Sequence, residues 1–142
     1  MHTYASALAL SGVSVPEHLV ADASVPILDG PQTQGDLMII PASMPNRATW
    51  RPVPTAGIQL VRGEATGNTH WLHQGFQSPG VLWADAADGV RIGYLHVPDG
   101  QNALLIHADE HGANGIAPGT YAIHRERSQA LTFNARQYLV QD

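Results

Sequence analysis

The sequence contains no cysteine and no lysine. Without cysteine the chain has no disulfides, no thiolate metal sites and no cysteine nucleophile. Its seven basic residues, all arginine, are scattered between Arg47 and Arg136 and are outnumbered by twelve acidic residues, which gives a formal charge of −5. Because nucleic-acid binding relies on a clustered basic surface, we expect no direct contact with nucleic acid.

Charged residues of either sign are also scarce. They make up 13% of the chain, which is about half the usual share. Much of the surface must therefore be neutral or apolar, which suits burial against protein partners, as in a homo-oligomer or a capsid-type assembly. The alternative is a soluble monomer covered by Gln, Asn, Thr and His.

Long apolar runs are missing too. No run approaches the roughly 18 residues that span a bilayer, so we expect no membrane role. The first residues lack the positively charged leader of a secretory signal, and we therefore expect cytoplasmic synthesis. A chain of 142 residues is long enough to bury one hydrophobic core without disulfides or a structural metal.

Residues 1–34 differ in composition from the remainder. They are rich in Ala, Ser, Val and Pro, and prolines at positions 16, 26 and 31 interrupt any long helix. We expect this segment to be an extended N-terminal arm, with at most one short helix over 16–22, that packs on a neighbouring subunit. Residues 35–142 are expected to form a β domain.

From Gly35 onward, short apolar stretches alternate with turn signals at about ten-residue intervals, a pattern typical of all-β folds. We expect a small antiparallel β-sandwich or barrel, jelly-roll-like. The glycine-rich residues 112–115 are among the expected turns. The expected strands are 36–41, 57–63, 69–74, 80–84, 90–97, 103–108, 119–126 and 135–141.

Histidine is the one ionisable type in excess, with eight residues. Several fall in two segments, GNTHWLHQG (67–75) and LLIHADEHG (104–112), and neutral imidazoles with a carboxylate hold zinc, iron, manganese or nickel. We expect the two segments to meet and form a candidate divalent-metal site. The alternative is that these histidines make only local hydrogen bonds and that no cofactor is needed. The candidate ligands are His70, His107, Glu110 and His111.

Sequence signatures of catalysis are weak. Residues 107–111 match the HxxEH pattern of one metallopeptidase class, but that pattern needs a helix, and here a strand-like run precedes it and glycines follow. There is no GxSxG elbow, no phosphate-binding P-loop and no dinucleotide turn. We therefore expect a protein that is not an enzyme. Three tryptophans, at 50, 71 and 83, fit core or interface anchors better than a ligand platform.

Two segments are similar to cupin motifs, the first running from Gly63 to His70 and the second from Gly112 to His124. The similarity is incomplete, because Asn68 occupies the place of the first cupin histidine and the glutamate between the motifs has no counterpart. A cupin-like metal-binding protein or small metalloenzyme is therefore the alternative function.

Four further segments, QGDLMIIPA (34–42), VRGEATGNTH (61–70), HADEHG (107–112) and IAPGTYAIHRER (116–127), together resemble a family of short uncharacterised bacterial and phage proteins. The resemblance covers about 34–142 and implies no activity. It retains His70, Glu110 and His111, while Asn68 replaces a family histidine.

The favoured function is a non-catalytic structural subunit of a larger assembly. The phage resemblance makes a virion decoration or accessory protein the concrete form of this expectation, with virion localisation if the gene is phage-borne. Because the core is self-sufficient, we expect the protein to stay folded in chelator and to change little in mild acid.

Overall fold

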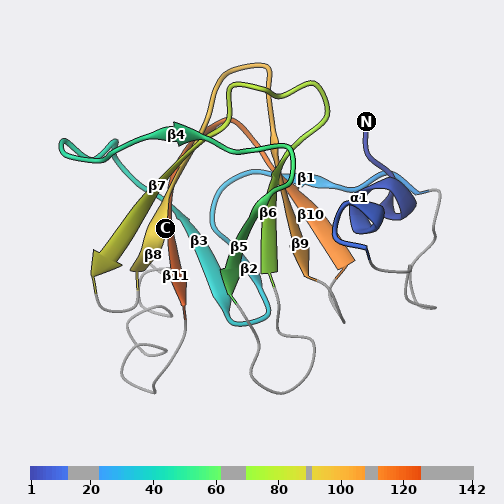
Figure 1. The fold of residues 1–142 in the computed structure, drawn as a ribbon, viewed down its shortest axis with the longest axis horizontal. Coiled ribbons are helices and arrows are strands. Elements are labelled where there is room, and N and C mark those ends of the chain that lie inside the picture. Colours follow the sequence, from blue (N-terminus) through green and yellow to red (C-terminus); the bar gives the residue numbers. More distant parts are fainter. Residues whose placement is uncertain (13–22, 62–69, 89–90, 108–111, 126–142) are drawn as a thin grey trace.

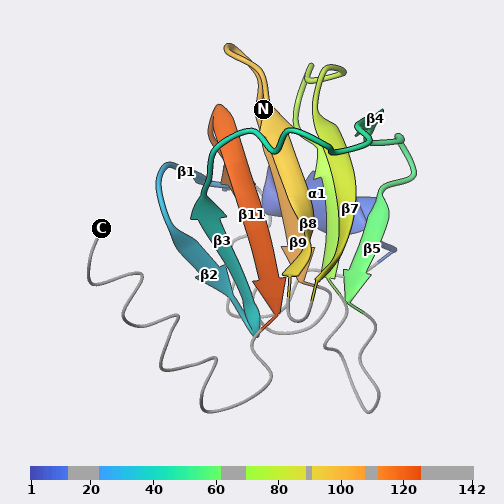
Figure 2. The same ribbon diagram turned by 90° about the vertical axis from the view of Figure 1, so that its left-hand side faces the viewer.

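The computed structural model describes residues 1–12, 23–61, 70–88, 91–107 and 112–125. Of these residues, 52% are in strands and 7% are in the helix. Two sheets face one another as the layers of a sandwich, and the described strands form no closed barrel (Figures 1 and 2). The all-β expectation is confirmed. Of the two expected architectures, sandwich or barrel, the structure is a sandwich.

The larger sheet has six strands in the order β2-β3-β11-β8-β7-β4, and every neighbouring pair is antiparallel. Its register places Ile123 of β11 opposite Ile39 of β3, which puts both side chains in the core between the sheets. The strands are β2 (Gln32–Gln34), β3 (Leu37–Pro41), β4 (Arg51–Pro52), β7 (Leu82–Asp88), β8 (Arg91–Val97) and β11 (Gly119–Arg125).

The smaller sheet has five strands in the order β1-β10-β9-β6-β5. Edge strand β1 runs parallel to β10, whereas the other pairs are antiparallel. The strands are β1 (Ile27–Leu28), β5 (Ile58–Val61), β6 (His70–Gln74), β9 (Ala103–His107) and β10 (Gly112–Ile116).

Trp83 is the largest fully buried side chain of the core. Its indole N–H donates a hydrogen bond to the Asp85 carboxylate at 2.8 Å, which satisfies the one polar atom of the ring. The ring lies against Gly93 on the neighbouring strand, where any Cβ would overlap it. Trp83 is thus a core anchor, while Trp71 packs beside the helix and Trp50 contacts His96 edge-on.

A short helix, α1 (Tyr4–Leu10), covers the outer face of β9 and β10 (Figure 1). Thr3 and Ser6 cap its first turn reciprocally, which satisfies backbone donors that a helix start leaves open. Ala7 and Leu8 are fully buried. They join a second apolar cluster that includes Val25, Leu104, Ile106 and Ala113.

The N-terminal segment therefore packs on its own domain throughout its described part. Besides α1, strand β1 pairs with β10 and strand β2 pairs with β3. The expectation that 1–34 packs on a neighbouring subunit is wrong for these residues. Pro26 and Pro31 follow the helix, so they do not interrupt it. The helix expected over 16–22 lies outside the described residues.

Strand β10 replaces the turn expected at 112–115. Gly112 enters the strand with φ +69°, and Gly115 leaves room for β1, since a Cβ there would lie 2.9 Å from Ile27 Cγ1. Glycine here allows neighbouring strands to approach closely. These glycines were expected to be turn residues. The expected strands between 36 and 126 correspond to β3, β5, β6, β7, β8, β9 and β11, whereas 135–141 lies outside the described residues.

No helix in the described ranges is long and apolar enough to cross a bilayer.

Candidate functional site

Chain segments distant in sequence converge at one end of the sandwich. His70 begins β6 and pairs in register with His107, which ends β9. In the facing sheet Arg125 ends β11, and Asp36 lies in the turn between β2 and β3. We call this the His70 end; it is the lower end in Figure 1.

The two imidazole rings at this end are stacked and buried. Their centroids are 4.2 Å apart with an interplanar angle of 6°. His70 is 0% exposed and His107 is 2% exposed. Two positively charged rings this close, and away from water, would repel one another strongly.

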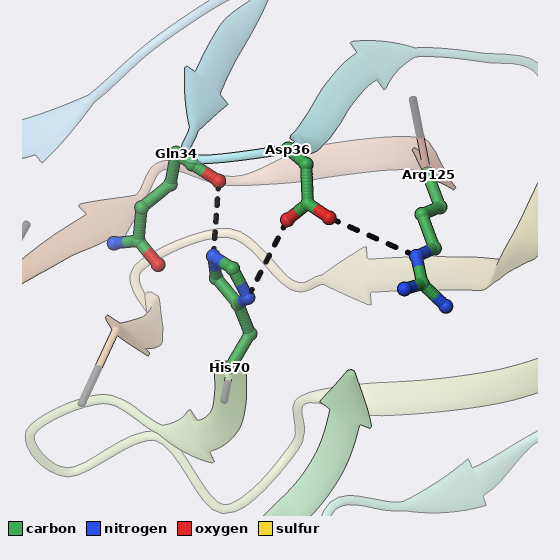
Figure 3. A network of polar contacts seen from close by, with 4 residues as sticks. All are labelled: Gln34, Asp36, His70 and Arg125. Carbon is green, nitrogen blue, oxygen red and sulfur yellow. Dashed lines mark hydrogen bonds and ion pairs between the residues drawn. The ribbon is translucent and has the colours of Figure 1, made fainter. Parts of the chain in front are cut away.

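A backbone carbonyl sets the tautomer of His70. The Nε2 atom lies 3.0 Å from the carbonyl oxygen of Gln34 (Figure 3). Because a carbonyl only accepts, Nε2 carries the hydrogen and the neutral ring has its lone pair on Nδ1. That Nδ1 atom faces Oδ1 of Asp36 at 4.0 Å. Metal-bound histidines show the same arrangement, with the second nitrogen donating to a carbonyl.

Asp36 joins the two layers electrostatically. Its Oδ2 atom lies 3.7 Å from Nε of Arg125 in its own sheet, while Oδ1 faces His70 in the other (Figure 3). Asp36 and Arg125 each keep about a third of their side-chain surface exposed (33% and 34%). Solvent screens this pair, so its role is orientation more than stabilisation.

A ladder of amide side chains holds the β2–β3 turn in place. Gln34 Nε2 donates to the Leu105 carbonyl at 3.1 Å and also contacts the Asn114 side chain, which in turn bonds to Gln32. Both glutamines are buried. Because each amide crosses between sheets, the ladder fixes the distance of the turn from the histidines.

Gly35 completes this close approach. Its φ of +59° suits glycine, and a Cβ at this position would lie 3.0 Å from His70 Nε2 and 3.4 Å from His107 Cε1. A side chain here would press on both rings. The Gln34-Gly35-Asp36 turn is therefore shaped around the histidine pair.

Of the expected metal ligands, the structure brings His70 and His107 together. Glu110 and His111 lie outside the described residues, so their part in the site stays a prediction. In the described part of the chain no three His, Asp or Glu side chains are grouped closely enough to hold a metal ion. His70 and His107 would therefore need further ligands to complete a metal site.

Two other histidines, His73 and His124, lie away from this end. His73 lies on the outer face of the smaller sheet, and burial lowers its pKa while a Thr55 backbone hydrogen bond acts in the opposite direction. His124 lines a cavity on the outer face of the larger sheet. Burial, and then the charge of Arg91, lower the pKa of His124. Neither belongs to the His70 end.

Asp36, Arg125 and Gln34 were not among the expected site residues. Two of them stand in the QGD segment and one in the RER segment, both part of the family-like pattern. The presence of both segments in that pattern was the sequence signal that could have identified these three residues. Their meeting with His70 follows from the packing of the two sheets, which local sequence does not specify.

No curated protein and no solved structure matches the chain. A family model described as "Domain of unknown function (DUF8820)" matches residues 33–126. The matched range contains Gln34, Asp36, His70, His107 and Arg125 of the His70 end. Because the match covers more than half of the chain, the protein belongs to the DUF8820 family, which bears out the expectation of an uncharacterised family.

Proposed function

We propose that the protein binds a divalent transition-metal ion at the His70 end and does so without catalysis. The observation that carries this proposal is the facing of His70 Nδ1 and Asp36 Oδ1 at 4.0 Å. With the hydrogen on Nε2, two electron-rich atoms oppose one another, and a positive species between them stabilises the arrangement. A metal ion and a proton on Nδ1 are the two candidates.

The surroundings favour a metal ion over a permanent proton. His107 stacks on His70 with the ring centroids 4.2 Å apart, so a second candidate imidazole ligand lies beside His70. A neutral imidazole is a good ligand for zinc, iron, manganese and nickel. His70 is also oriented from behind by Gln34, as the outer-shell contacts of metal sites require.

The remaining ligands are expected from Glu110 and His111. They follow His107 by three and four residues in the chain. The contiguous core between the sheets does not depend on them, so the metal is expected to be dispensable for folding.

The test is calorimetric titration of chelator-treated protein with Zn²⁺ and, separately, Ni²⁺ and Mn²⁺. We expect one equivalent of at least one ion to bind, and His70→Gln and His107→Gln each to weaken binding by more than tenfold. His96→Gln is the matched control. His96 is a partly buried histidine in the larger sheet, away from His70, and its Nδ1 bonds to the hydroxyl of Thr120 in the same sheet.

Failure of every ion to bind, or equal binding by the His70 and His96 variants, would overturn the proposal. In that case nitrogen-15 NMR of the imidazoles should find His70 doubly protonated beside Asp36. Circular dichroism of each variant establishes that the loss of binding is not a loss of fold.

A second candidate function is the structural subunit of an assembly, with a phage virion protein as its most specific form. It is favoured by a patch of exposed apolar side chains around the N-terminal segment. Met1, Ile27 and Phe76 are 69%, 46% and 49% exposed and line a shared cavity of about 110 Å³. Edge strand β1 lies in the same patch, and a second copy of this chain is the partner proposed for it.

Light scattering across a concentration series tests the assembly. We expect a defined oligomer that Phe76→Ser dissociates, whereas Met44→Ser, at a similarly exposed residue (47%) outside this patch, leaves it intact. A monomer at all concentrations would refute this candidate.

A further inference from the structure

The outer face of the larger sheet, which is turned toward the viewer in Figure 2, is apolar over β3 and β11. Leu37 and Ile39 of β3 point into the core between the sheets. Alternation therefore places Met38 and Ile40 on the outer face, where Ala122 of β11 pairs with Ile40. Antiparallel sheets of a sandwich usually turn polar side chains outward, yet these three are only 4%, 4% and 5% exposed. Something therefore covers this face.

Described residues account for the cover of Ile40 but not for that of Met38. Segment 42–46, which follows β3, lines a cavity together with Ile40, and Met38 is not among the described residues at that cavity. The apolar cluster of Met38 contains only Ile40 within the described part of the chain. Its register neighbours, the exposed Thr33 and the half-buried His124, lie beside it in the same sheet. A side chain on a sheet face is shielded from above, so another part of the chain covers Met38.

The course of the chain indicates which part this is. Strand β11 ends at Arg125, which pairs with Leu37, the residue that precedes Met38. The C-terminal segment 126–142 therefore starts next to Met38, and it lies outside the described residues. It is much longer than β3, which has five residues, so its length is sufficient to return along this face.

The C-terminal segment also has a suitable composition. Its large apolar side chains are Leu131, Phe133, Tyr138, Leu139 and Val140. The other undescribed segments of more than two residues belong to the opposite layer, since they connect strands of the smaller sheet or link helix α1 to it. These segments are 13–22, 62–69 and 108–111.

We propose that residues 126–142 return over the outer face of β3 and β11 and pack their apolar side chains on Met38 and Ile40. The occupant of this face is thus a segment of the same chain and not a neighbouring subunit. The contact uses none of the proposed metal ligands, and it leaves the patch around Phe76 as the surface for assembly.

The test uses the three methionines of the chain and its lack of cysteine. Methionine labelled with carbon-13 in its methyl group gives three NMR signals, and a single introduced cysteine, Gln137→Cys, carries a nitroxide on the full chain. The nitroxide should weaken the Met38 signal at least threefold relative to its reduced, diamagnetic state. Met1 lines a cavity with Leu104 of the smaller sheet, and its signal should be weakened clearly less.

The matched control is the same label at Asp99→Cys. Asp99 is exposed and follows β8, whose last residue pairs with Gly119 at the start of β11. Met38 pairs instead with His124, near the end of β11. A nitroxide at position 99 therefore lies at the far end of the larger sheet and should leave the Met38 signal nearly intact.

A variant without a label gives a second measurement. Phe133→Ser should shift the methyl resonance of Met38 and leave that of Met1 in place, which also shows that the fold is retained. If Gln137→Cys unfolds the protein, Asn134→Cys takes its place. All samples contain chelator, so the result does not depend on metal binding.

An intact Met38 signal, or equal weakening of Met38 and Met1 by the C-terminal label, would overturn the proposal. So would equal weakening of Met38 in a mixture of isotope-labelled chains with separate nitroxide-bearing chains, because the cover would then come from a second copy.

Discussion

At the scale of single residues, Gly57 shows how closely the backbone approaches a buried histidine. Its φ is +83°, and a Cβ there would lie 2.5 Å from Cε1 of His73. His73 is itself only 2% exposed, so the ring has little room to move away. Glycine is therefore required at this position for both its conformation and its size.

We predict that Gly57→Ala destabilises the protein by about 3 kcal/mol, the sum of left-handed strain and overpacking. Gly100→Ala is the matched control, because Gly100 has a similar φ of +76° but nothing within 4 Å of its would-be Cβ. It should cost about 1 kcal/mol, from backbone strain alone. Urea unfolding of both variants measures the difference, and equal losses would show that contact with His73 is not limiting.

The candidate site was only partly predictable from its residues. The meeting of His70 and His107 could be anticipated, because two histidine-bearing segments flank apolar runs that pair as neighbouring strands. Asp36 and Arg125 could not, since their distance from His70 depends on how two sheets pack. Alternation specifies the face of a side chain but not its partner across the core.

At the scale of elements, the sequence predicts strands well where apolar residues alternate. It fails where strand pairing or tertiary packing determines the structure. Strand β10 contains two glycines and was expected to be a turn, yet pairing with β9 and β1 makes it a strand. Helix α1 has seven residues, too few to be stable alone in water. It forms because Leu8 packs on the sheet, and the local sequence pattern does not predict that contact.

We predict that Leu8→Ala lowers the free energy of unfolding by about 2–5 kcal/mol, as a cavity in a packed cluster does. Leu10→Ala should change it by less than about 0.5 kcal/mol, because Leu10 is 43% exposed on the same helix. Chemical denaturation of both variants is the measurement. Equal small effects would mean that α1 does not belong to the cooperative unit and would revive the expectation of an N-terminal arm that packs on a neighbouring subunit.

At the scale of the whole molecule, histidines in the N-terminal segment and in both sheets make stability depend on pH. Burial is the first cause of a lowered pKa for His2 in the N-terminal segment, for His73 in the smaller sheet and for His124 in the larger sheet. Each ring is therefore harder to charge in the folded protein than in the unfolded chain. These shifts revise the sequence-based expectation that mild acid has little effect.

We predict that stability falls as the pH drops below the ordinary histidine pKa of 6.5. When the folded-state pKa is the lower one, the unfolded chain binds more protons in this window, so acidification favours unfolding; above 6.5 the stabilisation is fully present. Urea unfolding from pH 7.5 to 5, with EDTA throughout to exclude metal release, should show this decline. His73→Gln should reduce its slope, because the amide does not titrate, whatever its effect on stability at pH 7.5. A flat profile for the parent chain would contradict the prediction, because it would mean that the folded and unfolded states bind protons equally over this range.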